Sequence, residues 1–293
     1  MHLRNLSFGD SSIEIVTHSD KTREMVEMLF TGVPSEGSHA PHARLEISQD
    51  RDGGYRLSRD DKQIYAGESL AALANSLMDT SIFNLADKCS SGMLFHAACL
   101  SWKGRGVILP AQSGHGKTTL SAWLLSNGFD YLTDELVYLP LDSLRALCFG
   151  RPLNVKYGSR EIIEDLLGDN REDESIIRGP IAMLVPPSLI RADNEPVEPD
   201  VSMIFFPRYR ADTEFSLEKL SPAQTGMSMM ACLVNARNLP GDGFRSTVDL
   251  ARKVPAYNIT YPDFDGVLGR LRGCSKNVRS SRFFCAQGPG VPA

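Results

Sequence analysis

The stretch Ala111-Gln112-Ser113-Gly114-His115-Gly116-Lys117-Thr118-Thr119 is the most informative part of this 293-residue chain. Its second half matches the pattern G-x-x-x-x-G-K-[S/T], in which successive backbone N–H groups form a concave site for phosphate. A short apolar run ends just before it at Pro110, and a helical pattern follows over residues 118–126. A strand, a glycine-containing loop and a helix in this order are the context that the motif requires. The sequence therefore predicts a P-loop that binds a nucleoside triphosphate.

The residues of this loop are expected to act through both backbone and side chains. Lys117 can bridge the β- and γ-phosphates, and the Thr118 hydroxyl can ligate Mg²⁺. The N-terminus of the following helix adds partial positive charge. Ala111 departs from the pattern, which has glycine there, but alanine is harmless if its φ is ordinary. The predicted nucleotide-binding residues of the loop are Ser113, Gly114, His115, Gly116, Lys117, Thr118 and Thr119.

Two adjacent acids follow the predicted helix. Asp134 and Glu135 lie in an apolar run, residues 131–139, that predicts one strand. Because neighbours on a strand point to opposite faces, at most one of them is expected to aim directly at the site. Beside a phosphate loop, a carboxylate can hold Mg²⁺ or take a proton from an attacking hydroxyl. We expect Asp134 to be the proton acceptor and either acid to be a metal ligand; the alternative is a strand end that emerges into solvent.

Composition limits the partners. Hydrophobic residues make up 42% of the chain and charged residues 23%, an ordinary globular balance. The net charge of −5 does not indicate nucleic-acid binding. No apolar run approaches the ~20 residues of a membrane helix, and the N-terminus has no apolar signal core. The six cysteines form no Cys-x-x-Cys pair, so a cytoplasmic protein with free thiols is expected, with a homo-oligomer left open.

The pattern along the chain divides it into three parts. Residues 1–89 are expected to form a small N-terminal α+β region, 90–273 a P-loop kinase domain, and 274–293 a disordered tail rich in Ser, Gly, Pro and Arg. Apolar periodicity predicts strands at residues 12–16, 43–47, 55–57, 63–65, 93–100, 107–109, 131–139, 203–206 and 257–261, and an extended segment at 147–155. It predicts helices at residues 22–30, 69–85, 118–126, 161–167, 223–236, 245–253 and 264–271.

A histidine precedes the loop on the first predicted strand of the larger part. Taken alone, His96 in Leu94-Phe95-His96-Ala97-Ala98 is more typical of a hydrogen-bonded core histidine than of a catalytic one. The set Phe95-His96-Ala97, residues 111–118 and Thr133-Asp134-Glu135, in that order, resembles the HPr kinase/phosphorylase family. The chain is most similar to the subgroup called HprK-related kinase A, over residues 95–98, 109–120, 128–136, 150–158, 204–210, 217–223 and 254–271.

The resemblance implies an α/β fold whose kinase domain has a mixed sheet, similar to phosphoenolpyruvate carboxykinase. It also implies ATP and Mg²⁺ as cofactors and places His96 in the active site. The family's Glu-x-Arg-Gly segment has no clear match here; the corresponding stretch offers Arg151 and Lys156, which are suited to phosphate or acceptor binding. We therefore do not infer from the resemblance that HPr is the substrate or that the reverse phosphorylase reaction occurs.

A further basic candidate follows the apolar run at residues 203–206. Arg208 at a predicted strand end can steady the transferring phosphate or bind the base; the alternative is a solvated turn.

These residues predict a kinase that transfers the γ-phosphoryl group of ATP, or another nucleoside triphosphate, to a hydroxyl. The acceptor is a protein or peptide serine or a small molecule, which the sequence does not separate. The predicted catalytic residues are Lys117, His96, Asp134 and Glu135. The alternative is a nucleotide-binding sensor with little or no phosphotransfer, against which Asp134 and Glu135 weigh.

Overall fold

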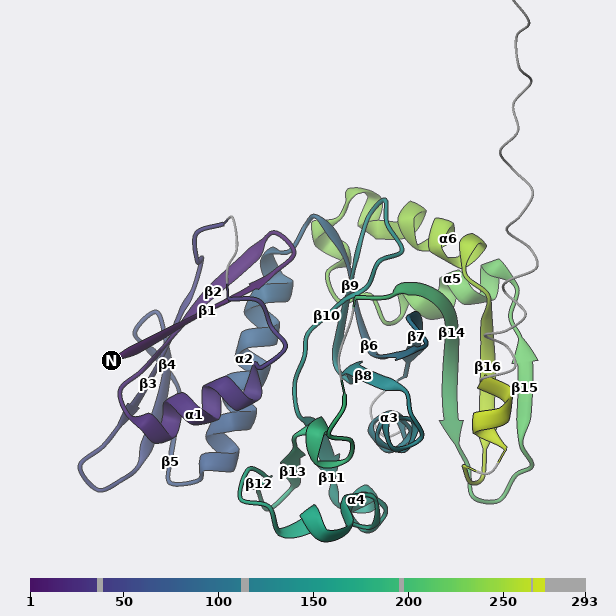
Figure 1. The fold of residues 1–293 in the computed structure, drawn as a ribbon. Helices are drawn as coiled ribbons and strands as arrows, with labels where there is room; N and C mark the ends of the chain where they lie inside the picture. The colour runs from purple at the N-terminus through teal and green to yellow at the C-terminus, as the bar shows by residue number, and fades with distance from the viewer. Residues whose placement is uncertain (36–38, 112–115, 195–197, 265, 272–293) are drawn as a thin grey trace, which may run out of the picture.

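A computed structural model describes residues 1–35, 39–111, 116–194, 198–264 and 266–271. Figure 1 shows two α/β units side by side, the smaller N-terminal one in purple and blue and the larger one running from teal to yellow. Ser113, Gly114 and His115 of the predicted loop lie outside the described residues, as does the predicted tail, 274–293. No helix in the described ranges is long and apolar enough to cross a membrane.

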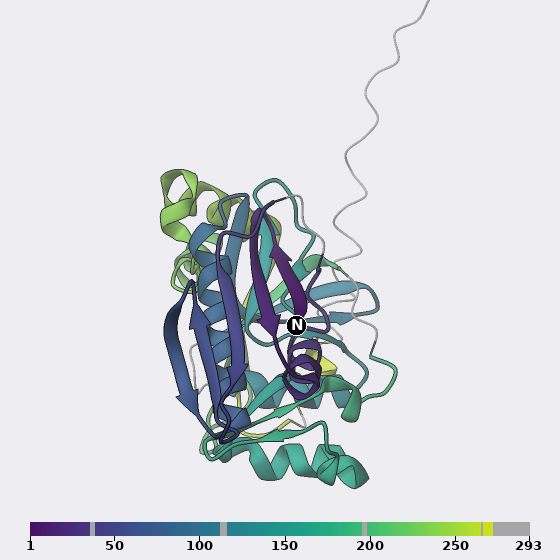
Figure 2. The same ribbon diagram turned by 90° about the vertical axis from the view of Figure 1, so that its left-hand side faces the viewer.

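The N-terminal unit is a sheet with two helices on one face. Its strands lie in the order β1 (His2–Phe8), β2 (Ser11–Thr17), β3 (Arg44–Gln49), β4 (Tyr55–Arg59) and β5 (Lys62–Gly67). Figure 2 looks onto this sheet, whose other face is covered by α1 (Asp20–Leu29) and α2 (Leu70–Lys88). Serines begin both helices, since the hydroxyls of Ser19 and Ser69 accept from backbone N–H groups of the first turn. The predicted strands and helices of this part are confirmed, while β1 was not predicted.

The larger unit is built on a mixed sheet. Its strand order is β10-β9-β6-β7-β14-β16-β15, with β8 also paired to β6. Within it, β14 is parallel to both β7 and β16, whereas β6 is antiparallel to β7, β8 and β9. The expected mixed sheet is thus confirmed. The strands are β6 (Gly92–Trp102), β7 (Arg105–Pro110), β8 (Asp130–Thr133), β9 (Leu136–Pro140), β10 (Leu147–Cys148), β14 (Asp200–Tyr209), β15 (Ser216–Lys219) and β16 (Ala256–Tyr261).

Helices cover both faces of this sheet. On one face, α3 (Lys117–Ser126) packs with Leu120 and Leu124 against Leu109 and Phe205. On the other, α5 (Pro222–Met230) and α6 (Phe244–Lys253) pack through Met229 and Leu250. α3 is the first helix after β7 in the chain, and the predicted phosphate loop lies between these two elements in the sequence.

A third, smaller layer packs beside α3. It consists of β11 (Leu153–Lys156), β12 (Ile177–Arg178), β13 (Ala182–Val185) and α4 (Arg160–Leu167). The short 3-10 segments of the described chain are Tyr157–Ser159, Gly168–Glu172, Pro187–Leu189, Ala236–Asn238 and Pro240–Gly243. Residues 267–271 form the described end of the last predicted helix.

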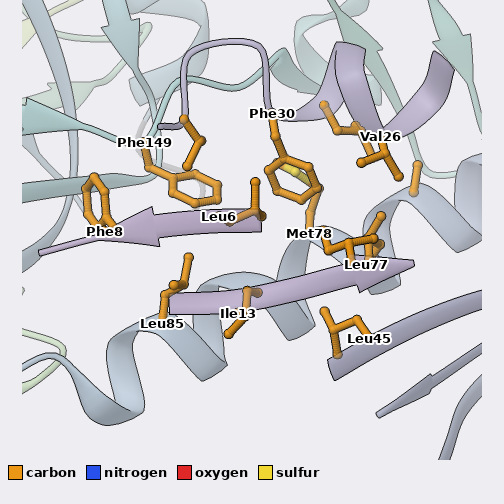
Figure 3. Packing of buried hydrophobic residues seen from close by; sticks show 14 of the residues in the cluster. Leu6, Phe8, Ile13, Val26, Phe30, Leu45, Leu77, Met78, Leu85 and Phe149 are labelled. Carbon is orange, nitrogen blue, oxygen red and sulfur yellow. The ribbon is translucent and has the colours of Figure 1, made fainter. Parts of the chain in front are cut away.

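Three aromatic rings join the two units. Phe149, which follows β10, packs edge-on against Phe8 and Phe30 of the N-terminal unit, with ring centroids 5.7 and 5.8 Å apart (Figure 3). Next to it, Gly150 touches Gly32 backbone to backbone, so a Cβ on Gly150 would lie 2.7 Å from the Gly32 Cα atom. The loop between β10 and β11 is therefore anchored to the N-terminal unit, and it carries Arg151.

The predicted single strand over residues 131–139 is wrong. The structure breaks it into β8 and β9, and Asp134 and Glu135 form the break. The Thr133 hydroxyl accepts from the backbone N–H groups of Glu135 and Leu136, at 3.2 and 3.5 Å. Such local bonds from a threonine side chain compete with strand pairing.

Two other predicted segments differ from the elements that the structure has. The helix expected over residues 223–236 stops at Met230, because Cys232 and Val234 instead hydrogen-bond through their backbones to β6. The buried Asn235 side chain holds this segment in place by donating to the carbonyls of Cys89 and Gly92. Of the extended segment expected over 147–155, only the ends are strands, because Phe149 turns into the N-terminal core. In both cases tertiary packing overrides local preference.

Candidate functional site

The site begins at the first turn of α3. Gly116 caps this helix with a φ of 83°, in the left-handed region that favours glycine. A Cβ at Gly116 would also lie 3.0 Å from the Tyr261 hydroxyl. Ala111, at the other end of the predicted loop, is not among the non-glycine residues with positive φ in the described chain, which are Asp60, Asp61, Lys103 and Asp242. Alanine in the first position of the motif is therefore unstrained.

Lys117 is held by a histidine. Its Nζ donates to His96 Nε2 at 2.9 Å, and His96 Nδ1 lies 3.0 Å from Glu135 Oε1. A neutral imidazole with its proton on Nδ1 satisfies both contacts, because it donates to the carboxylate and accepts from the ammonium. Burial lowers the pKa of Lys117, and the charges of Asp134 and Glu135 oppose that shift. His96 is thus a half-buried bridge between two charged groups and not an apolar core residue.

Asp134 is the most buried acid of the site. It is 2% exposed, and its carboxylate accepts from the Thr118 hydroxyl at 2.9 Å and from the Tyr131 hydroxyl at 3.0 Å. Burial, together with the charge of Asp134, holds the pKa of Tyr131 well above its ordinary value. Tyr131 is therefore a phenol at neutral pH, and it fixes one carboxylate oxygen while the other points to the start of α3.

Arg151 lies against both carboxylates of the site. Its side chain is 2% exposed; Nη1 donates to Glu135 Oε2 at 2.9 Å, and Nε lies 3.6 Å from Asp134 Oδ1. Burial alone would raise the pKa of Glu135, but the hydrogen bond from His96 and the charges of Arg151 and Lys117 lower it to about 2. Glu135 is therefore ionised at neutral pH.

Six of the predicted residues form one connected group, which we call the Lys117 cluster. Its members are Lys117, Thr118, His96, Asp134, Glu135 and Arg151. Both acids of the pair contact other members of the cluster. The expectation that at most one acid aims at this place is therefore wrong, because it rested on a continuous strand.

Other predicted residues lie around the cluster or away from it. The Thr119 hydroxyl donates to Ser159 at 2.6 Å, which ties the first turn of α3 to the segment before α4. Lys156 ends β11 with an exposed side chain. Arg208 lines a cavity near the end of β7. Ser113, Gly114 and His115 lie outside the described residues.

Two residues of the site were missed. Tyr131 lies three positions before Asp134, in the same apolar run, and a buried tyrosine usually finds a polar partner for its hydroxyl, so it could have been found. Ser159 carried no such signal, since its contact with Thr119 joins residues 40 positions apart.

The cluster could bind Mg²⁺ only together with phosphate oxygens and water. In the described part of the chain, no three His, Cys, Asp or Glu side chains gather as a group that could hold a metal by themselves. Mg²⁺ in nucleotide sites is instead bound through one or two protein oxygens, together with phosphate oxygens and water. The adjacent hydroxyl of Thr118 and carboxylate of Asp134 offer such a pair.

No protein-family model and no curated protein matches this chain. Among solved structures, the Hpr(Ser) kinase/phosphatase from Coxiella burnetii is similar over 64% of this chain and 95% of that chain, at 12% identity and a TM-score of 0.32. A likeness of this size does not by itself establish a shared activity, and membership of the HprK-related kinase A subgroup stays a prediction.

Proposed function

We propose that this protein is a kinase that transfers the γ-phosphoryl group of ATP or another nucleoside triphosphate to a hydroxyl group. The observation that carries the proposal is the Lys117 cluster, in which two cations, two carboxylates and a histidine meet at the first turn of α3. Phosphoryl transfer needs mainly positioning and charge neutralisation, and this set of side chains supplies both.

The proposed roles follow from the contacts. Lys117 exchanges His96 for phosphate oxygens and neutralises their charge. Asp134 accepts the proton of the attacking hydroxyl as the new O–P bond forms and the bond to the β-phosphate oxygen breaks, releasing the nucleoside diphosphate. His96 and Arg151 hold Glu135 from its two sides and so position it beside Asp134. Mg²⁺ bound at Thr118 and Asp134 would supply further positive charge to the phosphates.

The acceptor is proposed to be a serine of a protein or peptide, or a hydroxyl of a small molecule. Transfer of labelled γ-phosphate to a cell extract, separated by size into protein and small-molecule fractions, distinguishes the two. Label in neither fraction, with nucleotide binding intact, would favour a sensor without phosphotransfer.

Removal of the Lys117 ammonium tests the nucleotide site. We expect Lys117→Ala to weaken Mg·ATP binding by roughly 30-fold or more, because a buried charge-assisted contact to phosphate is lost. Isothermal titration of both proteins measures the difference. Lys253→Ala, at an exposed lysine at the end of α6, is the matched control and should bind as the wild type does. Equal affinity in wild type and Lys117→Ala would rule out the proposed nucleotide site.

Substitution of His96 tests whether the contacts of the Lys117 cluster are needed for activity. His96→Ala is expected to lower turnover by about 10²-fold, since Glu135 and Lys117 each lose a fixed partner. The melting temperature should stay within a few degrees of wild type, because the side chain is 35% exposed. His96→Gln, which keeps a donor and an acceptor, should restore part of the rate. A variant that is clearly destabilised yet fully active per folded molecule would show that His96 has a structural role only.

A further inference from the structure

A cavity lies on the face of the mixed sheet that α5 and α6 cover, opposite the face that α3 covers. Its floor is formed by β14, β16 and β15, which lie side by side in that order (Figure 1). On these strands, Ile204, Ala256 and Leu220 pack into the core under the two helices. Two residues away on each strand, the same face of the sheet lines a cavity of about 410 Å³, which is within the range of small-molecule sites.

The lining of this cavity is polar over most of its floor. Five polar side chains come from the three strands and a sixth from α5. None of the six makes a side-chain hydrogen bond or an ion pair with another residue of the described chain, so all are available to a polar ligand. The six are Arg208, Ser216, Glu218, Ser228, Asn258 and Thr260.

Two of these side chains carry opposite charges. Arg208 is level with Thr260 of the middle strand, and Glu218 is level with Asn258. The charged pair is therefore separated by two strands and by two residues along the strands, so usual sheet spacings put the Cα atoms roughly 12 Å apart. At this separation both side chains can reach one molecule between them. A ligand that carries charges of both signs would complement both.

The side of the cavity next to Arg208 is apolar. Phe206 precedes Arg208 by two residues on β14 and points to the same face. Pro110 and Ala111, at the end of β7, lie on the other side of β14 from β16. An apolar group next to the anionic group of the ligand would be removed from water at this wall.

The middle strand offers hydrogen bonds between the two charges. Asn258 carries both a donor and an acceptor, and Thr260 carries a hydroxyl. A dipeptide has a matching order of groups, which are a terminal ammonium, a peptide group, and a terminal carboxylate beside its second side chain. In extended form it spans roughly 7 Å, which leaves room for the side chains of Arg208 and Glu218 at its two ends.

We propose that this cavity binds a zwitterion of the size of a dipeptide, with its ammonium at Glu218 and its carboxylate at Arg208. The ligand has free termini and an apolar second side chain. The site is separate from the Lys117 cluster, because Lys117 begins α3 on the opposite face of the sheet. The proposal therefore goes beyond the proposed kinase function and does not depend on it.

Glycyl-leucine and two derivatives test the proposal. Amidation of the C-terminus removes the carboxylate charge, and acetylation of the N-terminus removes the ammonium charge. We expect isothermal titration to show binding of glycyl-leucine to the wild type. Each derivative should bind roughly tenfold or more weakly, because one charge-assisted contact is lost.

Two substitutions test the two charged contacts separately. Glu218→Gln should bind glycyl-leucine and its N-acetyl derivative with similar affinity and still prefer the free acid to the amide. Arg208→Gln should show the reverse pattern. Both side chains are exposed, so neither substitution is expected to unfold the protein. Arg210→Gln and Glu214→Gln, at exposed residues outside the lining, are the matched controls and should bind as the wild type does.

Lys117→Ala should also bind glycyl-leucine as the wild type does, whatever its affinity for Mg·ATP, and this separates the proposal from the kinase function. Loss of glycyl-leucine binding in Lys117→Ala would overturn the proposal of a separate site. Absence of binding to the wild type, or equal affinity for the three ligands, would overturn the assignment of a zwitterion. A Glu218→Gln protein that still discriminates against the N-acetyl derivative would do the same.

Discussion

Asp134→Asn is expected to lower phosphoryl transfer by about 10²–10⁴-fold, the usual contribution of a general base. The amide keeps the shape of the side chain and can still accept from Tyr131, but it cannot take the proton of the attacking hydroxyl. Affinity for the magnesium–nucleotide complex should fall by a much smaller factor than transfer does, because Lys117 still contacts the phosphates although one proposed Mg²⁺ ligand is weakened. Single-turnover transfer and isothermal titration on one preparation measure both quantities.

Asp130→Asn is a suitable control for this prediction. Asp130 begins the same strand, β8, and its carboxylate pairs with Arg191, away from the Lys117 cluster. This substitution removes a carboxylate with similar change of shape and should leave transfer intact. A collapsed thermal melt of Asp134→Asn in the absence of nucleotide would mean that the buried carboxylate is structural. Normal transfer by a folded Asp134→Asn protein would exclude it as the base.

The sequence predicted the elements around the site better than the contacts within it. Apolar periodicity and the glycine pattern place β7 and α3 within a residue or two, because both depend on neighbours in the chain. The break at Asp134 and Glu135 could not be placed in the same way. It depends on whether the Thr133 hydroxyl bonds to the backbone ahead of it or to another partner. Single polar side chains of this kind leave the periodic pattern unchanged.

The contacts of Arg151 could not be predicted either, because they depend on segments that are far apart in the chain. The sequence offered Arg151 as a group suited to phosphate or acceptor binding; its burial against two carboxylates was not predicted. The cause lies two residues earlier, where Phe149 enters the core of the N-terminal unit beside Phe8 and Phe30 (Figure 3). That packing turns the following residues inward, and no local pattern predicts a contact between segments so far apart in the chain.

The burial of Arg151 also has a consequence for charge. In the Lys117 cluster, the charges of Lys117 and Arg151 balance those of Asp134 and Glu135, so the buried group is close to neutral. Removal of one member leaves an opposite charge without compensation in a poorly hydrated place, and this costs more than an intact pair contributes. Arg151 is the member for which this effect should be largest, since its side chain is almost fully buried and faces both acids.

Arg151→Leu is therefore expected to lower the free energy of unfolding by about 3–5 kcal/mol at pH 7, the range for breaking a buried ion pair. The folded-state pKa of Glu135, about 2, lies below its ordinary value of 4.5, so the ionised carboxylate stabilises the fold above pH 4.5. That contribution is lost as the pH falls from 4.5 toward 2. Without Arg151 the pKa of Glu135 should rise toward the ordinary value, so the stability difference between wild type and variant should shrink in this window.

Urea unfolding at pH 7 and pH 3 measures this stability difference. Arg160→Leu, at an exposed arginine of α4, is the control and is expected to change stability little. A difference independent of pH would mean that Arg151 acts through packing and not through its charge on Glu135.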